Sequence, residues 1–287
     1  MTAKGKKRMI AWMIVVVLAV GLAALAVWTA WGNTALELNT YTEQSDRLPV
    51  AFNGYRIAQV SDLHNDEMGE GNENLLSVLR EAAPDIIVIT GDLIDSRRTN
   101  IDVALHFAAE AMKIAPCYYV TGNHEARISD YDRLREGLTE TGVVVLEDEK
   151  VYIQKDGESI AVLGVADPSF CADFMVSEEE TVGRVLDGLA EENRYTVLLS
   201  HRPELFELYR EKGMDLVLSG HAHGGQFRLP FVGGLAAPDQ GLFPKYDGGL
   251  YTEGDTNMIV SRGIGNSLFP FRFNNRPEVV LTQLQSK

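Results

Sequence analysis

The chain has 287 residues, of which 45% are hydrophobic and 23% charged, and its formal net charge is −15. This is ordinary globular composition, with enough residues for one large α/β domain or two small ones. Because the chain is strongly acidic, its general field repels nucleic acid, and we expect no nucleic-acid partner. An anionic substrate therefore needs a local positive charge, which bound metal ions can provide.

The N-terminus differs from the rest of the chain. Residues 1–8 hold four basic side chains and no acidic one, and residues 9–31 contain no charge. About 20 apolar residues suffice to cross a bilayer as a helix, so 9–31 is predicted to be a transmembrane signal-anchor helix. A cleaved signal peptide is the alternative, with Ala24-Leu25-Ala26 as its cleavage site, but the apolar stretch exceeds the usual core of roughly 7–15 residues.

The charges flanking this segment predict its orientation. Basic residues favour the cytoplasmic side, so residues 1–8 are expected in the cytoplasm and the body of the protein outside it, at the cell membrane. Residues 32–54 are polar and mixed without a clear period, and we interpret them as a linker leading into the fold. Cys117 and Cys171 lack any metal-type spacing and are expected to be unpaired.

From Tyr55 onward, apolar strands alternate with amphipathic helices. Strands are expected over 55–61, 85–90, 117–121, 143–146, 150–154, 159–165, 195–200, 214–219, 257–261 and 278–284. Helices are expected over 72–82, 102–114, 131–140, 178–189 and 204–212. Continuous apolar strands indicate sheets that are covered on both faces, and the closely spaced later strands indicate antiparallel pairing. The pattern predicts an α/β fold with two packed mixed sheets and helices outside.

Polar side chains follow five of these strands where each strand ends. Five of the six histidines are among them, and the sixth, His106, lies in a helix and is interpreted as structural. The carboxyl ends of strands in α/β sheets form one rim, so these side chains are expected to meet there. The candidate metal ligands are Asp62, His64, Asp92, Asn123, His201, His221 and His223.

Carboxylates, imidazoles and one carboxamide suit Zn, Mn or Fe. Seven ligands are too many for one ion and suit two ions that share a carboxylate. Gly91, Gly122 and Gly220 each precede a candidate ligand, and we expect them to supply the backbone freedom that a sharp turn needs.

Asp-x-His, Gly-Asp-x-x-Asp, Gly-Asn-His-Glu, a lone His and Gly-His-x-His follow one another in this order between Asp62 and His223. In this order and spacing they resemble the calcineurin-like metallophosphoesterase superfamily, over roughly 55–284. The wording "GHAHGGQ" is similar to its bacterial membrane-associated branch, including the UDP-2,3-diacylglucosamine pyrophosphatase-like phosphohydrolases. The resemblance implies a four-layer αββα sandwich of two mixed sheets over 55–287. It specifies the chemistry far better than the substrate.

The resemblance also implies a site with two divalent ions (Mn, Zn, Fe or Mg), and no other cofactor is expected. One ion would be held by Asp62, His64, Asp92 and His223, and the other by Asp92, Asn123, His201 and His221. A hydroxide between the ions would attack the phosphoester or pyrophosphate.

Beside this ligand set, the resemblance makes His124 a general acid or a stabiliser of developing charge, with Asp95 as the partner that fixes its ring. A helix N-cap is the alternative role for Asp95. Arg97, Arg98 and Arg127 lie close by in sequence, either as substrate contacts or as solvated surface residues.

Two apolar stretches, 227–234 and 267–273, follow the last motif. They either form a lip for a lipid tail near the membrane or pack within the domain. The leading hypothesis is a membrane-anchored phosphohydrolase acting on a phosphorylated small molecule or a lipid-linked substrate. The alternatives are a membrane-tethered metal-binding scaffold without turnover and a secreted nucleotide phosphodiesterase.

Overall fold

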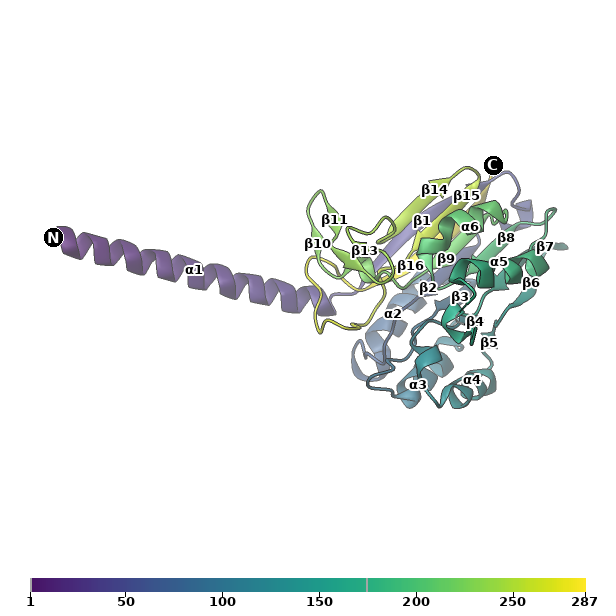
Figure 1. Ribbon diagram of the computed structural model, residues 1–287, viewed down its shortest axis with the longest axis horizontal. Helices are drawn as coiled ribbons and strands as arrows, with labels where there is room; N and C mark the ends of the chain where they lie inside the picture. Colours follow the sequence, from purple (N-terminus) through teal and green to yellow (C-terminus); the bar gives the residue numbers. More distant parts are fainter. Residues whose placement is uncertain (1, 174) are drawn as a thin grey trace.

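The computed structural model describes residues 2–173 and 175–287. A long N-terminal helix, α1 (Ala3–Thr34), projects from an α/β domain (Figure 1). The remaining α-helices are α2 (Glu73–Ala82), α3 (Ile101–Ala111), α4 (Tyr131–Glu140), α5 (Glu178–Leu189) and α6 (Phe206–Glu211). Short 3-10 helices occupy Val50–Phe52, Glu70–Asn72, Glu125–Arg127, Pro168–Phe170, Pro203–Leu205 and His223–Gly225.

Two six-stranded sheets form the centre of the domain. The first has the order β1 (Glu37–Ser45), β16 (Glu278–Ser286), β2 (Arg56–Val60), β3 (Ile86–Thr90), β4 (Cys117–Val120) and β5 (Val144–Val145). The second has the order β14 (Gly249–Glu253), β15 (Thr256–Val260), β9 (Leu216–Ser219), β8 (Thr196–Leu199), β7 (Glu158–Gly164) and β6 (Glu149–Lys155). Both sheets are mixed: β2 to β5 and β7, β8, β9 and β15 run parallel, whereas β16–β2, β14–β15 and β6–β7 are antiparallel.

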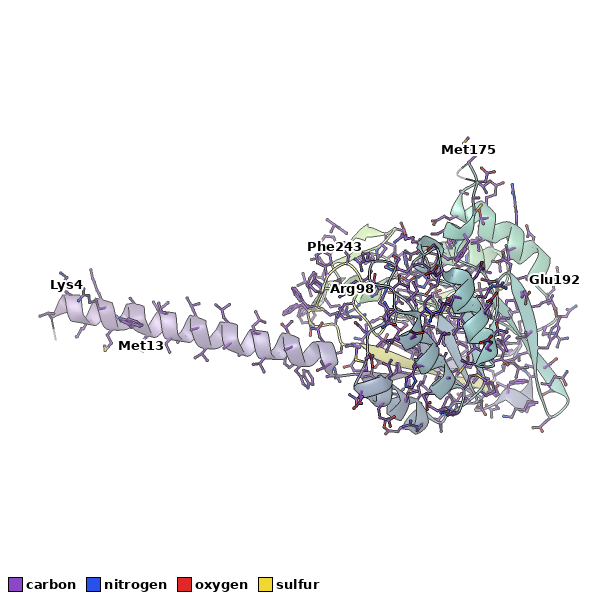
Figure 2. The ribbon with its side chains drawn as sticks, turned by 90° about the horizontal axis from the view of Figure 1, so that it is seen from below. Lys4, Met13, Arg98, Met175, Glu192 and Phe243 are labelled. Carbon is purple, nitrogen blue, oxygen red and sulfur yellow. The ribbon has the colours of Figure 1, made fainter. Side chains whose placement is uncertain are left out.

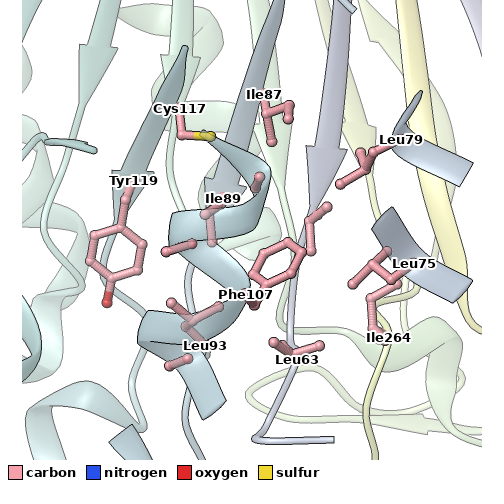
Figure 3. Close-up of a cluster of buried hydrophobic side chains, with 14 of the residues drawn as sticks. Leu63, Leu75, Leu79, Ile87, Ile89, Leu93, Phe107, Cys117, Tyr119 and Ile264 are labelled. Atoms are coloured by element: carbon pink, nitrogen blue, oxygen red, sulfur yellow. The ribbon is translucent and has the colours of Figure 1, made fainter. Parts of the chain in front are cut away.

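The domain has four layers, because each sheet buries both of its faces. In β3, Ile87 and Ile89 pack toward α2, α3 and α4, while Ile86 and Val88 pack between the sheets. Figure 3 shows the first of these clusters, where Phe107 of α3 lies among side chains of the sheet and of α2. On the far side, α5 and α6 cover the second sheet. The predicted αββα sandwich of two mixed sheets is confirmed.

Most predicted elements form close to their expected limits, and α4 and α5 begin and end at the predicted residues. α3 ends at Ala111 rather than Ile114, shortly before Pro116, whose ring disfavours helical backbone in the residue preceding it. Four two-residue strands were not expected: β10 (Arg228–Leu229), β11 (Gly233–Gly234), β12 (Ala236–Ala237) and β13 (Gly241–Leu242).

The segment 32–54, expected to be a linker, is largely structured. Its residues Glu37–Ser45 form β1, which pairs in parallel with β16 over nine residues, and Phe52 is fully buried between the sheets. α1 is long and apolar enough to cross a membrane by length and composition, and none of its apolar window is buried.

We expect Leu75→Ala, in α2, to lower the free energy of unfolding by about 2–5 kcal/mol, because Leu75 is fully buried and its truncation leaves a cavity. Leu250→Ala is the matched control, since Leu250 is 44% exposed and surface changes usually cost within about 0.5 kcal/mol. Denaturant unfolding of both variants in the same detergent measures the difference. Equal losses would contradict this assignment of the core.

Candidate metal centre

Five strand ends from the two sheets meet at one edge of the sandwich. Asp62 and His64 follow β2, Asp92 follows β3, and Asn123 follows β4 in the first sheet. His201 follows β8 and the pair His221 and His223 follows β9 in the second. All seven side chains are buried in the structure, at most 5% exposed. The sheets therefore bring together every residue that the sequence proposed as a ligand.

Asp62, His64, Asp92 and His223 form the first group, with their potential ligand atoms all within 4.8 Å of one another. Nε2 of His64 lies 3.6 Å from Oδ2 of Asp92 and 3.1 Å from Nε2 of His223. Nε2 of His223 lies 3.2 Å from Oδ1 of Asp62. Two carboxylates and two imidazoles thus face a common point.

Asp92, His201 and His221 form a second such group, so Asp92 belongs to both. Oδ2 of Asp92 lies 3.3 Å from Nε2 of His201, which lies 3.2 Å from Nδ1 of His221. The side-chain amide of Asn123 lies 3.0 Å from the same Nδ1. This second group matches the remaining predicted ligands.

Hydrogen bonds on the far side of two rings orient their inner nitrogens. Nδ1 of His201 lies 2.7 Å from the carbonyl oxygen of Thr90, so it carries the proton and leaves Nε2 toward Asp92. Nε2 of His221 lies 2.9 Å from Oδ2 of Asp239, which leaves Nδ1 toward the group. A histidine that binds a metal commonly donates its other N–H to a carbonyl or carboxylate in this way.

Burial keeps three of the imidazoles neutral. It lowers the pKa of His64 to about 3 and that of His221 to about 4, and it lowers the pKa of His223 well below its usual value. Burial opposes the charge of Asp92 also, but the neighbouring His201 outweighs it and holds the pKa of Asp92 well below its usual value. Burial also disfavours the charge of His201, but the carboxylates of Asp92 and Asp62 outweigh it and raise the pKa of His201 to about 10, so His201 must release a proton when it binds a metal. The other three rings are already neutral, which is the state in which imidazole binds metal.

The contacts within the site fit cations between the side chains. Oδ1 of Asp62 is buried without a hydrogen-bond partner, and burial raises the pKa of Asp62 to about 6. The oxygen of Asn123 faces Nδ1 of His221, an acceptor against an acceptor, and only exchange of its amide O and N would satisfy both groups. A buried acceptor without a donor is costly, and a cation at each group would satisfy these atoms.

The backbone at the site is held in an uncommon conformation. Asp62, His64, Asp92, His221 and His223 all have φ between 48° and 67°, a region that few residues other than glycine adopt. Backbone strain of this kind persists where the surrounding structure fixes it, and it concentrates at functional sites.

The glycines that precede three ligands act in two ways. Gly91 has a φ of 88° and supplies the expected backbone freedom. Gly122 and Gly220 do not have positive φ, so the expectation was wrong for them. They provide space instead: a Cβ at Gly122 would lie 2.3 Å from Oδ1 of Asp92, and one at Gly220 would lie 2.0 Å from Oγ of Ser61.

His124 lies beside the first group but is not one of its four residues. Its ring is 4.5 Å from that of His64, centre to centre, and its backbone N–H donates to Oδ1 of Asp92 at 2.8 Å. Nδ1 accepts a hydrogen bond from the Ser96 backbone N–H at 3.0 Å, and burial lowers the pKa of His124. The neutral ring therefore carries its proton on Nε2, which lies 3.4 Å from Oγ of Ser267.

Asp95 does not form the hydrogen bond to His124 that the sequence suggested. Its Oδ1 is 3.7 Å from Nδ1 of His124 and accepts instead from the backbone and side chain of Arg97. Ser96 occupies the position against the ring, because the turn aims its N–H there. His106 is exposed in α3, away from these groups.

A cavity of about 440 Å³ opens over the site. Arg97 and Arg127 line it together with His124, whereas Arg98 does not and its side chain is 72% exposed. Leu268, in the second apolar stretch, lines it also. Two cationic side chains therefore face the space above the ligands.

Sequence reasoning missed Glu125, which holds two of the site's loops together. Its carboxylate accepts hydrogen bonds from the backbone N–H groups of Asp92, Leu93, Ile94 and Gly122, at 2.7–3.2 Å. Burial raises the pKa of Glu125 to about 8, and these donors oppose that shift. Its place in "GNHE" was visible, but nothing in the sequence showed that it would reach back to the loop after β3.

Two other missed residues support His221. Asp239, which accepts from the ring, also pairs with Arg202 at 2.5 Å, and Arg202 is bound on its other side by Asp167 at 2.6 Å. Asp239 comes from the turn-rich segment after β12, where the sequence has no periodic pattern to predict its position.

Comparison with known proteins agrees with this geometry. The family model for calcineurin-like phosphoesterases matches residues 55–225. The metallophosphoesterase YkuE of Bacillus subtilis (strain 168) is 31% identical over 265 residues, covering 88% of this chain and 86% of that protein. The phosphodiesterase YaeI of Escherichia coli (strain K12) is 29% identical over 242 residues, covering 80% and 82%.

Two further similarities concern the membrane and the fold. A transmembrane protein with metallophosphoesterase domain from Danio rerio is 28% identical and covers 82% of this chain and 54% of that protein. The crystal structure of TT1561 of Thermus thermophilus has a TM-score of 0.51 at 16% identity, over 73% of this chain and 90% of that one. The latter similarity supports the fold alone.

We expect Glu125→Gln to weaken divalent metal binding by roughly 10–100-fold, the usual cost of losing a group that orients metal ligands. An amide NH₂ would point at two backbone N–H donors and push the loops apart. Calorimetric titration with Mn²⁺ measures the change, and Glu110→Gln in α3 is the control. Unchanged affinity in Glu125→Gln would show that the loops hold their positions without this carboxylate.

Proposed function

The chain belongs to the calcineurin-like phosphoesterase family and is a hydrolase of phosphoester bonds, and we propose that it is a membrane-anchored phosphohydrolase whose site comprises the two side-chain groups that share Asp92. The observation that supports this most directly is the sharing itself. One carboxylate lies between two sets of buried imidazoles, His64 and His223 on one side and His201 and His221 on the other. A closed structural site would not need two such groups beneath an open cavity.

Members of this family use two divalent metal ions. We assign Asp62, His64, Asp92 and His223 to one ion and Asp92, Asn123, His201 and His221 to the other. When bound, the ions supply Lewis-acid polarisation of the phosphoryl group and activation of a water molecule. The nitrogen and oxygen ligands suit Mn, Zn and Fe.

The chain's own residues then orient the substrate and supply a proton. Arg97 and Arg127 line the cavity and can donate hydrogen bonds to phosphoryl oxygens. The phosphorus forms a bond to the oxygen of water and loses its bond to the leaving oxygen. The attacking water releases a proton to solvent. His124 presents Nε2–H to the cavity; as a general acid it would first take up a second proton, and the imidazolium would then give its Nε2 proton to the leaving oxygen and return to the neutral ring. Asp95 would act through charge and through Arg97 rather than by a hydrogen bond to the ring.

We propose that α1 anchors this enzyme in the membrane. Residues 9–31 would span the bilayer, residues 1–8 would lie in the cytoplasm, and the domain from 55 onward would lie outside it, as the positive-inside rule favours. Every face of the apolar window is exposed, which distinguishes α1 from a core helix. The substrate is a phosphorylated small molecule, and the nearby anchor favours a lipid-linked one.

We expect the full-length protein in detergent to hydrolyse p-nitrophenyl phosphate or its bis ester only in the presence of divalent metal. Exhaustive chelation should abolish turnover, and added Mn²⁺ or Zn²⁺ should restore it. Asp92→Ala should lose turnover together with bound metal, since it removes a ligand from both groups, and His106→Ala is its control. Full activity after chelation, or metal binding without any turnover, would contradict the proposal; the latter outcome would favour a scaffold.

We expect His124→Asn to retain the metals and to lose turnover by roughly 10²–10⁴-fold on a substrate with a poor leaving group. The loss should be smaller for p-nitrophenyl esters, because p-nitrophenolate leaves without protonation. The backbone contact of residue 124 with Asp92 survives the change. The measurements are metal content and turnover across a series of leaving groups, with His106→Asn as the control. Equal slowing across the series would assign His124 to the phosphoryl oxygens, and loss of metal would make it a ligand.

A further inference from the structure

Several large apolar side chains are exposed on two loops beside the catalytic cavity. Phe231, Val232, Leu242 and Phe243 come from the segment that contains β10 to β13, and Leu268 and Phe269 from the loop after β15. Their exposure runs from 46% for Phe269 to full exposure for Phe231. We refer to these six residues as the apolar rim.

The two loops pack against each other and form one surface. Phe227 contacts Phe269 and Phe271 edge to face, with ring centres 5.5 Å apart in each pair. The backbone N–H of Arg228 donates to the carbonyl of Phe273 at 2.9 Å. Phe231 and Phe243 have φ of 67° and 55°, which is rare for bulky residues. Both aromatic side chains are exposed to solvent, Phe231 fully and Phe243 by 61%.

The apolar rim lies at the end of the domain from which α1 leaves. Figure 1 shows β10, β11 and β13 on that side. In Figure 2, Phe243 and Arg98 are on the side of the domain where α1 attaches, whereas Met175 and Glu192 are on the far side. An exposed apolar surface in this place differs from scattered surface residues, because one particular solvent, the bilayer, lies next to it.

No flexible spacer separates the domain from α1. Only Ala35 and Leu36 lie between the end of α1 and the start of β1. The side chain of Asn33 donates to the carbonyl of Arg272 at 2.9 Å and accepts from its N–H at 2.7 Å. The Arg276 guanidinium stacks on Trp31 at 4.8 Å and donates to the carbonyl of Ala35 at 2.6 Å. If α1 spans the membrane, its position therefore determines how far the domain lies from the bilayer.

At this distance from the bilayer, the loop after β15 lies at the depth of the membrane interface. A groove of about 690 Å³ lies between α1, from Leu22 to Thr34, and the domain, which contributes Asp66, Glu67, Met68, Asn266, Pro270 and Phe271. Leu22 lies within the proposed span 9–31, about 14 Å before Trp31 at 1.5 Å per residue. Part of the loop therefore lies alongside the last turns of the span, and the two carboxylates in the same groove fit the headgroup region better than the acyl chains.

We propose that the apolar rim inserts into the outer leaflet as a second membrane contact, so that the catalytic cavity opens at the bilayer surface. The inference rests on the proposed anchoring by α1. Aromatic and aliphatic side chains at the interface are stabilised there. Since Leu268 belongs both to the rim and to the cavity lining, the mouth of the cavity would meet the headgroup region. A phosphorylated headgroup could then reach the metal groups while its acyl chains stay in lipid.

The test uses the full chain in nanodiscs of phosphatidylcholine and phosphatidylglycerol. A fluorophore is attached to single cysteines at Phe231→Cys, Phe243→Cys, Val20→Cys or Met175→Cys, in a Cys171→Ser background with the buried Cys117 retained. Quenching by iodide in water is compared with quenching by doxyl groups on lipid chains. We expect positions 20, 231 and 243 to be quenched by the lipid probe, and position 175 by iodide.

Each outcome separates the inference from the proposed anchoring. Iodide quenching at 231 and 243 with lipid quenching at 20 would overturn the rim's membrane contact and leave α1 as the anchor. Iodide quenching at 20 would overturn both. Protection of 231 and 243 from both quenchers would point to a protein partner or a second copy, and would overturn the inference.

A charge substitution tests whether the rim residues drive insertion. Val232→Glu combined with Leu242→Glu should move the label at position 243 from lipid to water, while the label at position 20 stays in lipid. The same double variant without a label should retain turnover of water-soluble p-nitrophenyl esters, because neither residue lines the cavity. A label at 243 that remains in lipid would show that the fluorophore, and not the rim, causes insertion.

Discussion

The structure depends on the burial of Asp92 as a charged group. A buried carboxylate is unfavourable unless donors or cations surround it, and Asp92 meets this requirement from several directions. The His124 backbone N–H binds one oxygen at 2.8 Å, and His64 and His201 face the other at 3.6 and 3.3 Å. These partners come from both sheets, so the sandwich must close before the carboxylate is satisfied. The site therefore forms only when the two sheets pack together.

The same requirement explains the unusual backbone around the site. The proposed ligands turn inward from the ends of their strands and converge on two groups. Left-handed backbone at five of them achieves this turn, and the glycines at 122 and 220 leave room for Asp92 and Ser61. Glu125 then locks two of the turns through their N–H groups. Rigid elements thus hold a strained arrangement, as functional sites need.

Much of this could be predicted from the sequence, because each ligand directly follows an apolar run and the carboxyl ends of parallel strands share an edge. The prediction failed where periodicity is weak. β1 is polar on its outer face and pairs with a strand more than two hundred residues away, so only the folded sheet reveals it. Ser96 and Asp239 support His124 and His221 through contacts set by turn geometry, and a turn gives no periodic signal. Gly122 shows a further limit, since steric space at a residue depends on neighbours distant in sequence.

The loop between β15 and β16 connects α1 to the candidate metal centre. Its Arg272 is bound by Asn33 of α1 through the backbone, while the buried guanidinium lies 3.4 Å from Nδ1 of His223 and donates to the carbonyls of Arg262 and Gly265. Ser267, in the same loop, lies beside Nε2 of His124. A displacement of α1 relative to the domain would therefore move groups that contact His223 and His124. The loop that contacts α1 therefore also forms one wall of the site.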